Sequence, residues 1–330
     1  MVFEFIPRRH AVNSNWTHFV LVMCVLICIV ARGEEKNDLL ETLTNSGIKI
    51  VRNDEGQVTT LQFRGSQNID SNLALVKDLK YLENLDFYHS QVADSDLIHL
   101  RDLKRITNLS FEVTEITDAG VAHLKDLVNL RSLTLGDTQI TDSALAYLQG
   151  LENLEVLHLY RTEITGSGLV HLTGLKKLEL LHCAQTHITD SVCAHIEGHT
   201  NLWRLSLYGT KITNSGLKCT KRMQKLTMLD IGQTQITNDG LVHLTGLEKL
   251  NNLAVYNTSI SDSGLKHLKK LVNLERIGLK GTQITDSGLV HLKQLPKLNS
   301  LQFERTAVTD AGIADLRKTL PDCKISHSQP

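Results

Sequence analysis

The chain has 330 residues and a nearly balanced charge, because 35 Lys and Arg stand against 36 Asp and Glu. This balance excludes a protein whose main task is to bind nucleic-acid phosphates. Hydrophobic residues make up 41% of the chain and charged residues 22%, a composition that excludes a disordered protein. Leucine occurs 55 times, while only 5% of the residues are aromatic and only four are proline. A leucine-rich chain without a proline-rich linker indicates internal repeats.

Residues 1–33 have the layout of a secretory signal peptide. Arg8 and Arg9 precede an uncharged apolar run over residues 19–31, and small residues follow before the acidic Glu34. We therefore expect a mature chain that begins near Glu34 and is secreted or lies in the periplasm or cell envelope. The alternative is an uncleaved membrane anchor, but a spanning helix needs roughly 20 apolar residues and this run is shorter.

Residues 34–65 are expected to form an N-terminal cap built from a helix and a hairpin. The pattern predicts a short helix at 39–43 and strands at 48–52 and 58–63. The segment Asn53–Gly56 between the strands has the composition of a tight hairpin turn. Such a cap would cover the leucines that a first repeat exposes on its open side.

From residue 66 to the end the chain repeats with a period of 24. A Thr opens the unit at nine positions and a Ser at two more, which gives eleven units without an insertion over residues 66–330: Ser66, Ser90, Thr114, Thr138, Thr162, Thr186, Thr210, Thr234, Thr258, Thr282 and Thr306. After the last unit, a short edge strand at 323–325 is expected to close the C-terminal end, where Lys324 discourages further pairing.

Each unit contains a strand pattern and a helix pattern. Leu157 and Leu159 alternate with polar residues, which predicts a short strand with one buried face. Leu169, Leu172 and Leu175 follow at steps of three, which predicts one face of a short helix. Stacked units join the strands into a parallel sheet and the leucines into one core. Because packed helices need more room than paired strands, the sheet lines a concave surface.

Two further features of the unit carry structural predictions. The opening Thr follows each strand at a fixed distance, so its hydroxyl is expected to bond the backbone of the turn. A glycine recurs at one helix position, as at Gly168 and Gly216, and is expected to allow close approach to the neighbouring unit. The segment 154–164, L-x-x-L-x-L-x-x-T-x-I, resembles the leucine-rich repeat, with Thr in the usual Asn or Cys place.

The I-T-D-x-G-L extension of the unit resembles exported bacterial leucine-rich-repeat proteins, and also the cysteine-containing repeats of F-box substrate receptors. The resemblance covers residues 66–330. It implies an α/β solenoid, or horseshoe, with a parallel concave sheet and convex helices. It also implies a binding role, with a protein or peptide as the partner.

The concave face is the predicted binding surface, because outward strand positions of successive units line up on it. The middle strands combine aromatic, basic and apolar residues, a composition typical of binding hot spots. The predicted ligand-binding residues are Val156, His158, Tyr160, Leu180, His182, Arg204, Tyr208, Met228, Asp230 and Tyr256. Tyr160, Tyr208 and Tyr256 are 48 residues apart, and the small Ala184 and Gly232 between them are expected to leave slots. Descent from a 48-residue double unit is the other explanation of this spacing.

Histidines and cysteines offer a metal-binding alternative. Seven histidines share one helix position: His99, His123, His171, His195, His243, His267 and His291. Equivalent positions on packed helices are about 8–10 Å apart, too far for two ligands of one zinc ion. We expect these side chains to be partly covered and to bond neighbouring backbone. Cys193, His195 and His199 lie close together in one atypical unit. However, Cys193 stands at a core position of the repeat, and the nearby Gly198 weakens the helix that would hold the ligands, so we favour packing over a metal site.

No phosphate-binding glycine loop, nucleophile elbow or zinc-protease motif occurs in the sequence. The sequence therefore predicts a non-enzymatic, exported binding scaffold without a cofactor, which contacts a membrane only if its N-terminal segment is uncleaved. Three alternatives stay open: a sugar or peptide receptor that uses the tyrosines as a stacking platform, a substrate receptor of an SCF-type ubiquitin ligase, and a metal-dependent enzyme. The second lacks a preceding F-box-like helical domain.

Overall fold

The computed structural model describes residues 40–65, 73–74, 76–77 and 79–327. The chain divides into two compact units, residues 1–48 and residues 49–330. In the first unit residues 40–45 are helical, and Leu40, Leu43 and Ile48 are buried. The predicted signal peptide lies outside the described residues, so it stays a prediction. Within the described residues no helix is long and apolar enough to cross a membrane.

The second unit is built on one sheet. Its described residues form 13 strands in chain order: β1 Lys49–Arg52, β2 Val58–Gln62, β3 Asn84–Asp86, β4 Asn108–Ser110, β5 Ser132–Thr134, β6 Val156–His158, β7 Leu180–His182, β8 Arg204–Ser206, β9 Met228–Asp230, β10 Asn252–Ala254, β11 Arg276–Gly278, β12 Ser300–Gln302 and β13 Lys324–Ser326. β1 and β2 form the predicted antiparallel hairpin, and all later pairs are parallel. The hairpin thus belongs to the same compact unit as the repeats.

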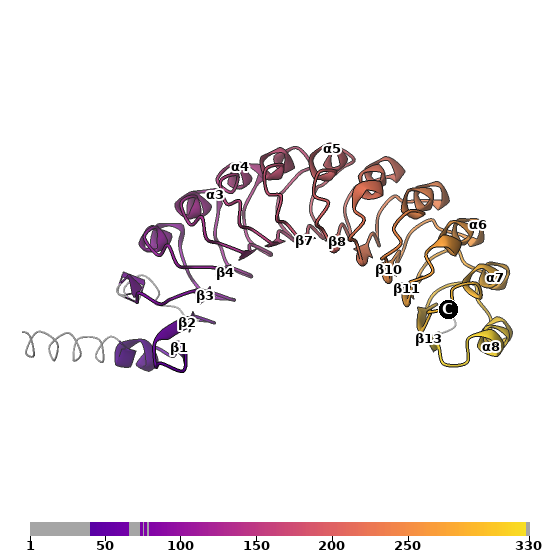
Figure 1. The fold of residues 1–330 in the computed structure, drawn as a ribbon, viewed down its shortest axis with the longest axis horizontal. Coiled ribbons are helices and arrows are strands. Elements are labelled where there is room, and N and C mark those ends of the chain that lie inside the picture. Colours follow the sequence, from indigo (N-terminus) through magenta and orange to yellow (C-terminus); the bar gives the residue numbers. More distant parts are fainter. Residues whose placement is uncertain (1–39, 66–72, 75, 78, 328–330) are drawn as a thin grey trace, which may run out of the picture. The chain divides into compact units, whose positions relative to one another are not determined.

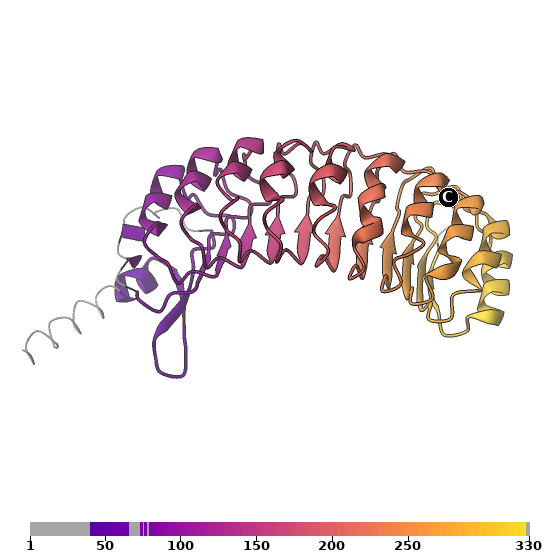
Figure 2. The same ribbon diagram turned by 45° about the horizontal axis from the view of Figure 1, so that its top comes forward.

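The strands pair with a constant offset that reproduces the sequence period. In β6 and β7, Leu157 lies opposite Leu181, 24 residues later, and both side chains are fully buried. Within this unit, Figures 1 and 2 show the strands along the inner side of an arc and the helices along its outer side. The predicted α/β solenoid with a concave parallel sheet is therefore confirmed.

The helices are short, and many are 3₁₀ rather than α. They are η1 Asp94–Leu100, α3 Asp118–Val121, η2 Ala122–Leu124, α4 Asp142–Ala146, η3 Gly168–Leu172, α5 Val192–Ile196, η4 Asn214–Arg222, η5 Asn238–Leu244, α6 Asp262–Leu265, η6 Lys266–Lys270, η7 Asp286–Gly288, α7 Leu289–Leu292 and α8 Asp310–Thr319. Steps of three between leucines match the three residues per turn of a 3₁₀ helix better than the 3.6 of an α-helix. The spacing of the leucines in the sequence therefore favours the 3₁₀ form.

The Thr that opens each repeat bonds a backbone carbonyl three residues earlier, at the end of the preceding repeat. The Thr162 hydroxyl donates to the carbonyl oxygen of Leu159 at 2.6 Å. Eight other repeat threonines make the same bond: Thr114, Thr138, Thr186, Thr210, Thr234, Thr258, Thr282 and Thr306. The predicted bond between the Thr hydroxyl and the turn backbone is confirmed, and it gives each of these turn carbonyl groups a hydrogen-bond partner.

The repeat glycines make room for a carboxylate of the preceding repeat. Oδ1 of Asp142 accepts the backbone N–H of Thr165 at 2.7 Å, and Oδ2 accepts its hydroxyl at 2.5 Å. A Cβ on Gly168 would lie 2.4 Å from Oδ1 of this carboxylate, closer than real Cβ contacts come. An Asp or Asn bonds the next repeat in this way at Asp94, Asp118, Asp190, Asn214, Asn238, Asp262 and Asp286. Close approach between units, predicted for these glycines, is confirmed.

The junction between the repeats at 162–185 and 186–209 lacks this link between repeats and has different residues in its place. Gly166 stands where the other repeats have Asp or Asn, and Val192 stands where the next repeat would have glycine. A Cβ on Gly166 would lie 2.0 Å from the Ser191 hydroxyl oxygen, so a side chain there would require Ser191 to move. The buried His199 instead links the two repeats, because its Nε2 lies 3.0 Å from the carbonyl oxygen of Leu172. Burial lowers the pKa of His199, so the neutral ring donates this hydrogen bond.

Each strand from β2 to β12 is followed by a residue in the left-handed backbone conformation. Gly65, Gly209 and Gly281 occupy this position with φ of 69°, 68° and 68°, and eight non-glycine residues share it: His89, Val113, Asp137, Arg161, Gln185, Gln233, Asn257 and Arg305. The conformation turns the backbone N–H toward the next strand; Arg161 N–H, for example, bonds the carbonyl oxygen of Ala184 at 2.9 Å. The sheet ladder thus continues past the strand ends.

Candidate functional site on the concave sheet

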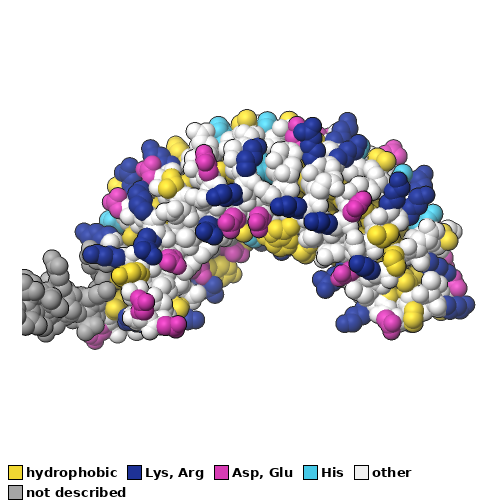
Figure 3. Space-filling view, viewed as in Figure 1, with side chains coloured by type: hydrophobic (Ala, Val, Ile, Leu, Met, Phe, Trp, Pro, Cys, Tyr) yellow, Lys and Arg dark blue, Asp and Glu magenta, His cyan; other side chains and the backbone are white. Residues whose placement is uncertain are grey.

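The predicted binding residues lie on the concave sheet or directly after its strands. Val156 and His158 belong to β6, Arg204 to β8, and Met228 and Asp230 to β9. Most are half-buried, and the residues between them point into the core. In Figure 3 apolar side chains are visible at the middle of the concave edge, where β7 and β8 lie.

Tyr160 reaches across two strands to an acidic residue. Its hydroxyl donates to Oε1 of Glu112, 48 residues earlier in the chain. The ring lies against Gly136, where a Cβ would be 2.3 Å from Cε1 of the tyrosine. Burial and this carboxylate raise the pKa of Tyr160, so its hydroxyl stays protonated. Because Gly136 has no side chain, it leaves room for the Tyr160 ring to lie against the backbone that follows β5.

Two histidines meet beside this tyrosine. Nδ1 of His158 and Nδ1 of His182 are 3.3 Å apart, and their residues are paired across β6 and β7. The His182 ring also lies 5.0 Å from the Tyr160 ring, centroid to centroid. Burial, His158 and Arg204 lower the pKa of His182 to about 4, and burial also lowers the pKa of His158. Both imidazoles are therefore neutral at pH 7.

A hollow of about 350 Å³ lies next to the histidine pair. It is lined by His182, Arg204, Leu205, Ser206, Met228, Leu229, Asp230, Asn252, Ala254 and Tyr256. Within the described chain no carboxylate oxygen comes within 4.0 Å of the Arg204 guanidinium, so this charge is unpaired. Burial raises the pKa of Asp230, although the Gly232 N–H bonds its carboxylate at 3.1 Å and Arg204 lies nearby.

The other tyrosines sit differently from Tyr160. Tyr256 lies over Gly278 on β11, where a Cβ would be 2.0 Å from Cε1 of the ring, so this side chain points away from Tyr160. Cδ2 of Tyr208 is 3.1 Å from the Cβ position of Gly232. The rings of Tyr160 and Tyr256 thus lean away from the predicted slots at Ala184 and Gly232, and Tyr208 is the tyrosine whose ring comes near Gly232.

Two concave residues are less exposed than the alternation indicates. Leu180, a predicted ligand-binding residue, is only 7% exposed, so it offers little surface to a ligand. Ser206, whose strand position should face solvent, is 5% exposed. Leu180 belongs to β7 and Ser206 to the neighbouring β8. Strand alternation places a residue on a face but does not set its exposure.

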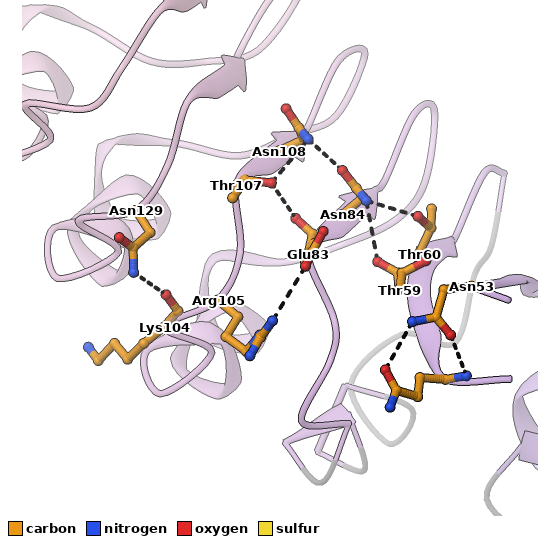
Figure 4. A network of polar contacts seen from close by, with 11 residues as sticks. Asn53, Thr59, Thr60, Glu83, Asn84, Lys104, Arg105, Thr107, Asn108 and Asn129 are labelled. Carbon is orange, nitrogen blue, oxygen red and sulfur yellow. Dashed lines mark hydrogen bonds and ion pairs between the residues drawn. The ribbon is translucent and has the colours of Figure 1, made fainter. Parts of the chain in front are cut away.

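The N-terminal strands carry a row of hydrogen-bonded polar side chains, a polar ladder, that was not predicted from the sequence. The amide of Asn84 donates to Oγ1 of Thr60 at 3.0 Å, and the amide of Asn108 bonds the Oδ1 of Asn84 (Figure 4). At the edge of the sheet, Arg105 pairs with Glu83 at 3.6 Å. These side chains bond one another across repeats. A polar ladder with a spacing of 24 was visible in the sequence at residues 60, 84 and 108.

The convex histidines are half-buried, as predicted, but six of the seven do not form the expected backbone bonds within the described chain. Within the described chain His123, His171, His195, His243, His267 and His291 make no hydrogen bond, and Nδ1 of His243 is buried without a partner. His199 faces the carbonyl oxygens of Ile196 and Leu172, so packing accounts for its position. Among the described residues no three His, Cys, Asp or Glu side chains are grouped to hold a metal ion.

Comparison with known proteins identifies the fold. No protein-family model matches the chain, and no curated protein sequence matches it. An internalin (InlF) of Listeria monocytogenes is similar in structure, with a TM-score of 0.61, 22% identity, and coverage of 82% of this chain and 87% of the internalin. A leucine-rich-repeat protein of Leptospira interrogans has a TM-score of 0.58 and 21% identity, and the match covers 77% of this chain and 62% of that protein. The chain therefore has the leucine-rich-repeat solenoid fold.

Proposed function

We propose that this protein is a non-enzymatic scaffold that binds a protein partner through the middle of its concave sheet. The observation that carries this proposal is the hollow lined by His182, Arg204 and Tyr256, which combines an unpaired Arg204 with apolar and hydrogen-bonding groups. Arginine and tyrosine at a partly desolvated centre are typical of interaction hot spots. The solenoid fold supports a scaffold, because stacked repeats present an extended concave surface.

Export is part of the proposal. The charged start, the apolar run at 19–31 and the small residues before Glu34 support a cleaved signal peptide. Similar folds in two bacterial leucine-rich-repeat proteins are compatible with it. N-terminal sequencing of the protein from its native host tests export: a chain that begins near Glu34 supports it, and one that begins at Met1 in the membrane fraction contradicts it.

The sugar-receptor alternative receives less support from the geometry. A stacking platform needs a free aromatic face, but the ring of Tyr160 lies against Gly136 and near the ring of His182. Tyr256 lies against Gly278 in the same way. The ring faces that lie against these glycines are therefore not free for a sugar to stack on.

Substitutions on the two faces test the binding proposal. Tyr160→Ala and Tyr208→Ala should each weaken binding of a captured partner by more than about 1 kcal/mol, because truncated hot-spot residues cost at least that much. Lys269→Ala changes an exposed side chain on the convex helix η6, so it should leave binding unchanged. Titration of the purified partner, followed by fluorescence of Trp203, measures each affinity. Loss of binding on the convex side alone would place the interface on the helices.

A further inference from the structure

Neighbouring strands bring equivalent residues much closer together than neighbouring helices do. Helices pack about 8–10 Å apart, so equivalent histidines of the convex row start from backbone positions that are farther apart than those on the sheet. Strands are about 4.8 Å apart, so histidines 24 residues apart on the sheet can meet. This happens once in the described sheet, at His158 and His182, whose Nδ1 atoms are 3.3 Å apart.

We propose that His158 and His182 form a two-histidine binding site for a divalent transition-metal ion on the concave sheet. An ion at 2.0–2.1 Å from both Nδ1 atoms would subtend an N–metal–N angle of about 104–111°, which is close to tetrahedral. Imidazole nitrogen suits Cu²⁺, Zn²⁺ and Ni²⁺, and affinity is highest for Cu²⁺. Neither ring makes another hydrogen bond within the described chain, so both Nδ1 atoms can turn to an ion.

The protonation states favour this site at neutral pH. Burial keeps both imidazoles neutral, so the ion displaces no proton from an imidazolium. In the free protein one Nδ1–H donates to the other Nδ1. When the ion binds, this ring carries its proton on Nε2 instead, by exchange with solvent, and no net proton is released. Because the described chain groups no third ligand here, water fills the remaining coordination positions.

Two charged neighbours influence the affinity in opposite directions. Glu112 raises the pKa of His158, so its charge also attracts a cation bound there. Arg204 lowers the pKa of both histidines, so it repels the same cation. An ion bound at His158 and His182 must therefore respond to both side chains, whereas an ion bound elsewhere would respond to neither.

The test is a titration of the chelator-treated full chain with CuSO₄ and with ZnCl₂ at pH 7, followed by calorimetry. We expect one ion per chain, with Cu²⁺ bound more tightly than Zn²⁺, and nitrogen hyperfine coupling in the Cu²⁺ EPR spectrum. His158→Gln and His182→Gln should each lower the Cu²⁺ affinity at least about tenfold. His187→Gln, an exposed histidine 3.0 Å from Glu163 at another position, is the matched control and should leave it unchanged.

Arg204→Gln keeps both ligands and separates metal binding from misfolding. It should raise the Cu²⁺ affinity several-fold, and Glu112→Gln should lower it, while circular dichroism confirms that each variant is folded. The proposal is overturned if the wild-type chain binds no Cu²⁺. It is equally overturned if folded His158→Gln and His182→Gln bind Cu²⁺ as the wild type does, or if only the His187→Gln control loses the ion.

Discussion

Val113 is a β-branched residue in the left-handed conformation, with φ of 59°. This conformation costs an L-residue roughly 1–2 kcal/mol, and asparagine tolerates it better than valine. Val113→Asn should therefore raise the free energy of unfolding by about 0.5–1 kcal/mol, measured by urea denaturation. Gln139→Asn, at an exposed position without a positive φ, should change it by less than about 0.5 kcal/mol. A destabilised Val113→Asn would show that the packing of the valine outweighs its strain.

His182 should make the stability depend on pH. Its folded-state pKa of about 4 lies below the usual 6.5, so the unfolded chain binds the proton more readily. The stabilisation is fully present above pH 6.5 and is lost as the pH falls toward 4. His182→Gln should therefore lose less stability than the wild type between pH 7 and pH 4.5 in denaturant titrations. Identical losses in the two proteins would mean that His182 does not titrate in this range.

At the scale of one element, the junction between the repeats at 162–185 and 186–209 carries Gly166 and Val192 in place of the Asp and glycine of other junctions. Gly166→Asp would push a carboxylate against Ser191 and Val192, and overpacking of this kind costs about 1–3 kcal/mol. The double variant Gly166→Asp with Val192→Gly restores the arrangement of the other repeats, in which Asp bonds the next repeat beside a glycine. It should recover more than about 1 kcal/mol of that loss.

Thermal and urea denaturation of the single and double variants measures this coupling. Gly150→Asp is the matched control, because no atom lies within 4 Å of the Cβ position of Gly150. Additive losses in the double variant would show that the two positions act independently.

At the scale of the whole repeat array, the C-terminal cap protects the last repeat. α8 covers that end with buried Ile313 and Leu316, and β13 pairs with β12. Removal of residues 307–330 should expose apolar core and the edge of β12, because terminal repeats need a polar outer surface. We expect a lower melting temperature and larger species in size-exclusion chromatography. A monomeric, equally stable 1–306 chain would contradict the capping role.

The period, the buried strand positions, the hairpin and the threonine bonds could all be predicted from the sequence. They depend on local backbone geometry and on a repeat of 24, which also sets the pairing between strands. Leu157 opposite Leu181 is a direct consequence of that repeat. The left-handed residues could have been predicted in part, since Gly209 and Gly281 mark their position.

Only the tertiary structure decided how the concave side chains meet. The period places His158 beside His182, but the direction of each ring depends on its rotamer and on the size of its neighbours. Tyr160 reaches Glu112 because Gly136 leaves room for its ring, and Leu180 is covered although its strand position faces outward. His199 likewise replaces the Asp–Thr link only because the packed interior places its Nε2 against a carbonyl oxygen of the preceding repeat. Sequence period determines which residues are neighbours, whereas packing determines which of their atoms touch.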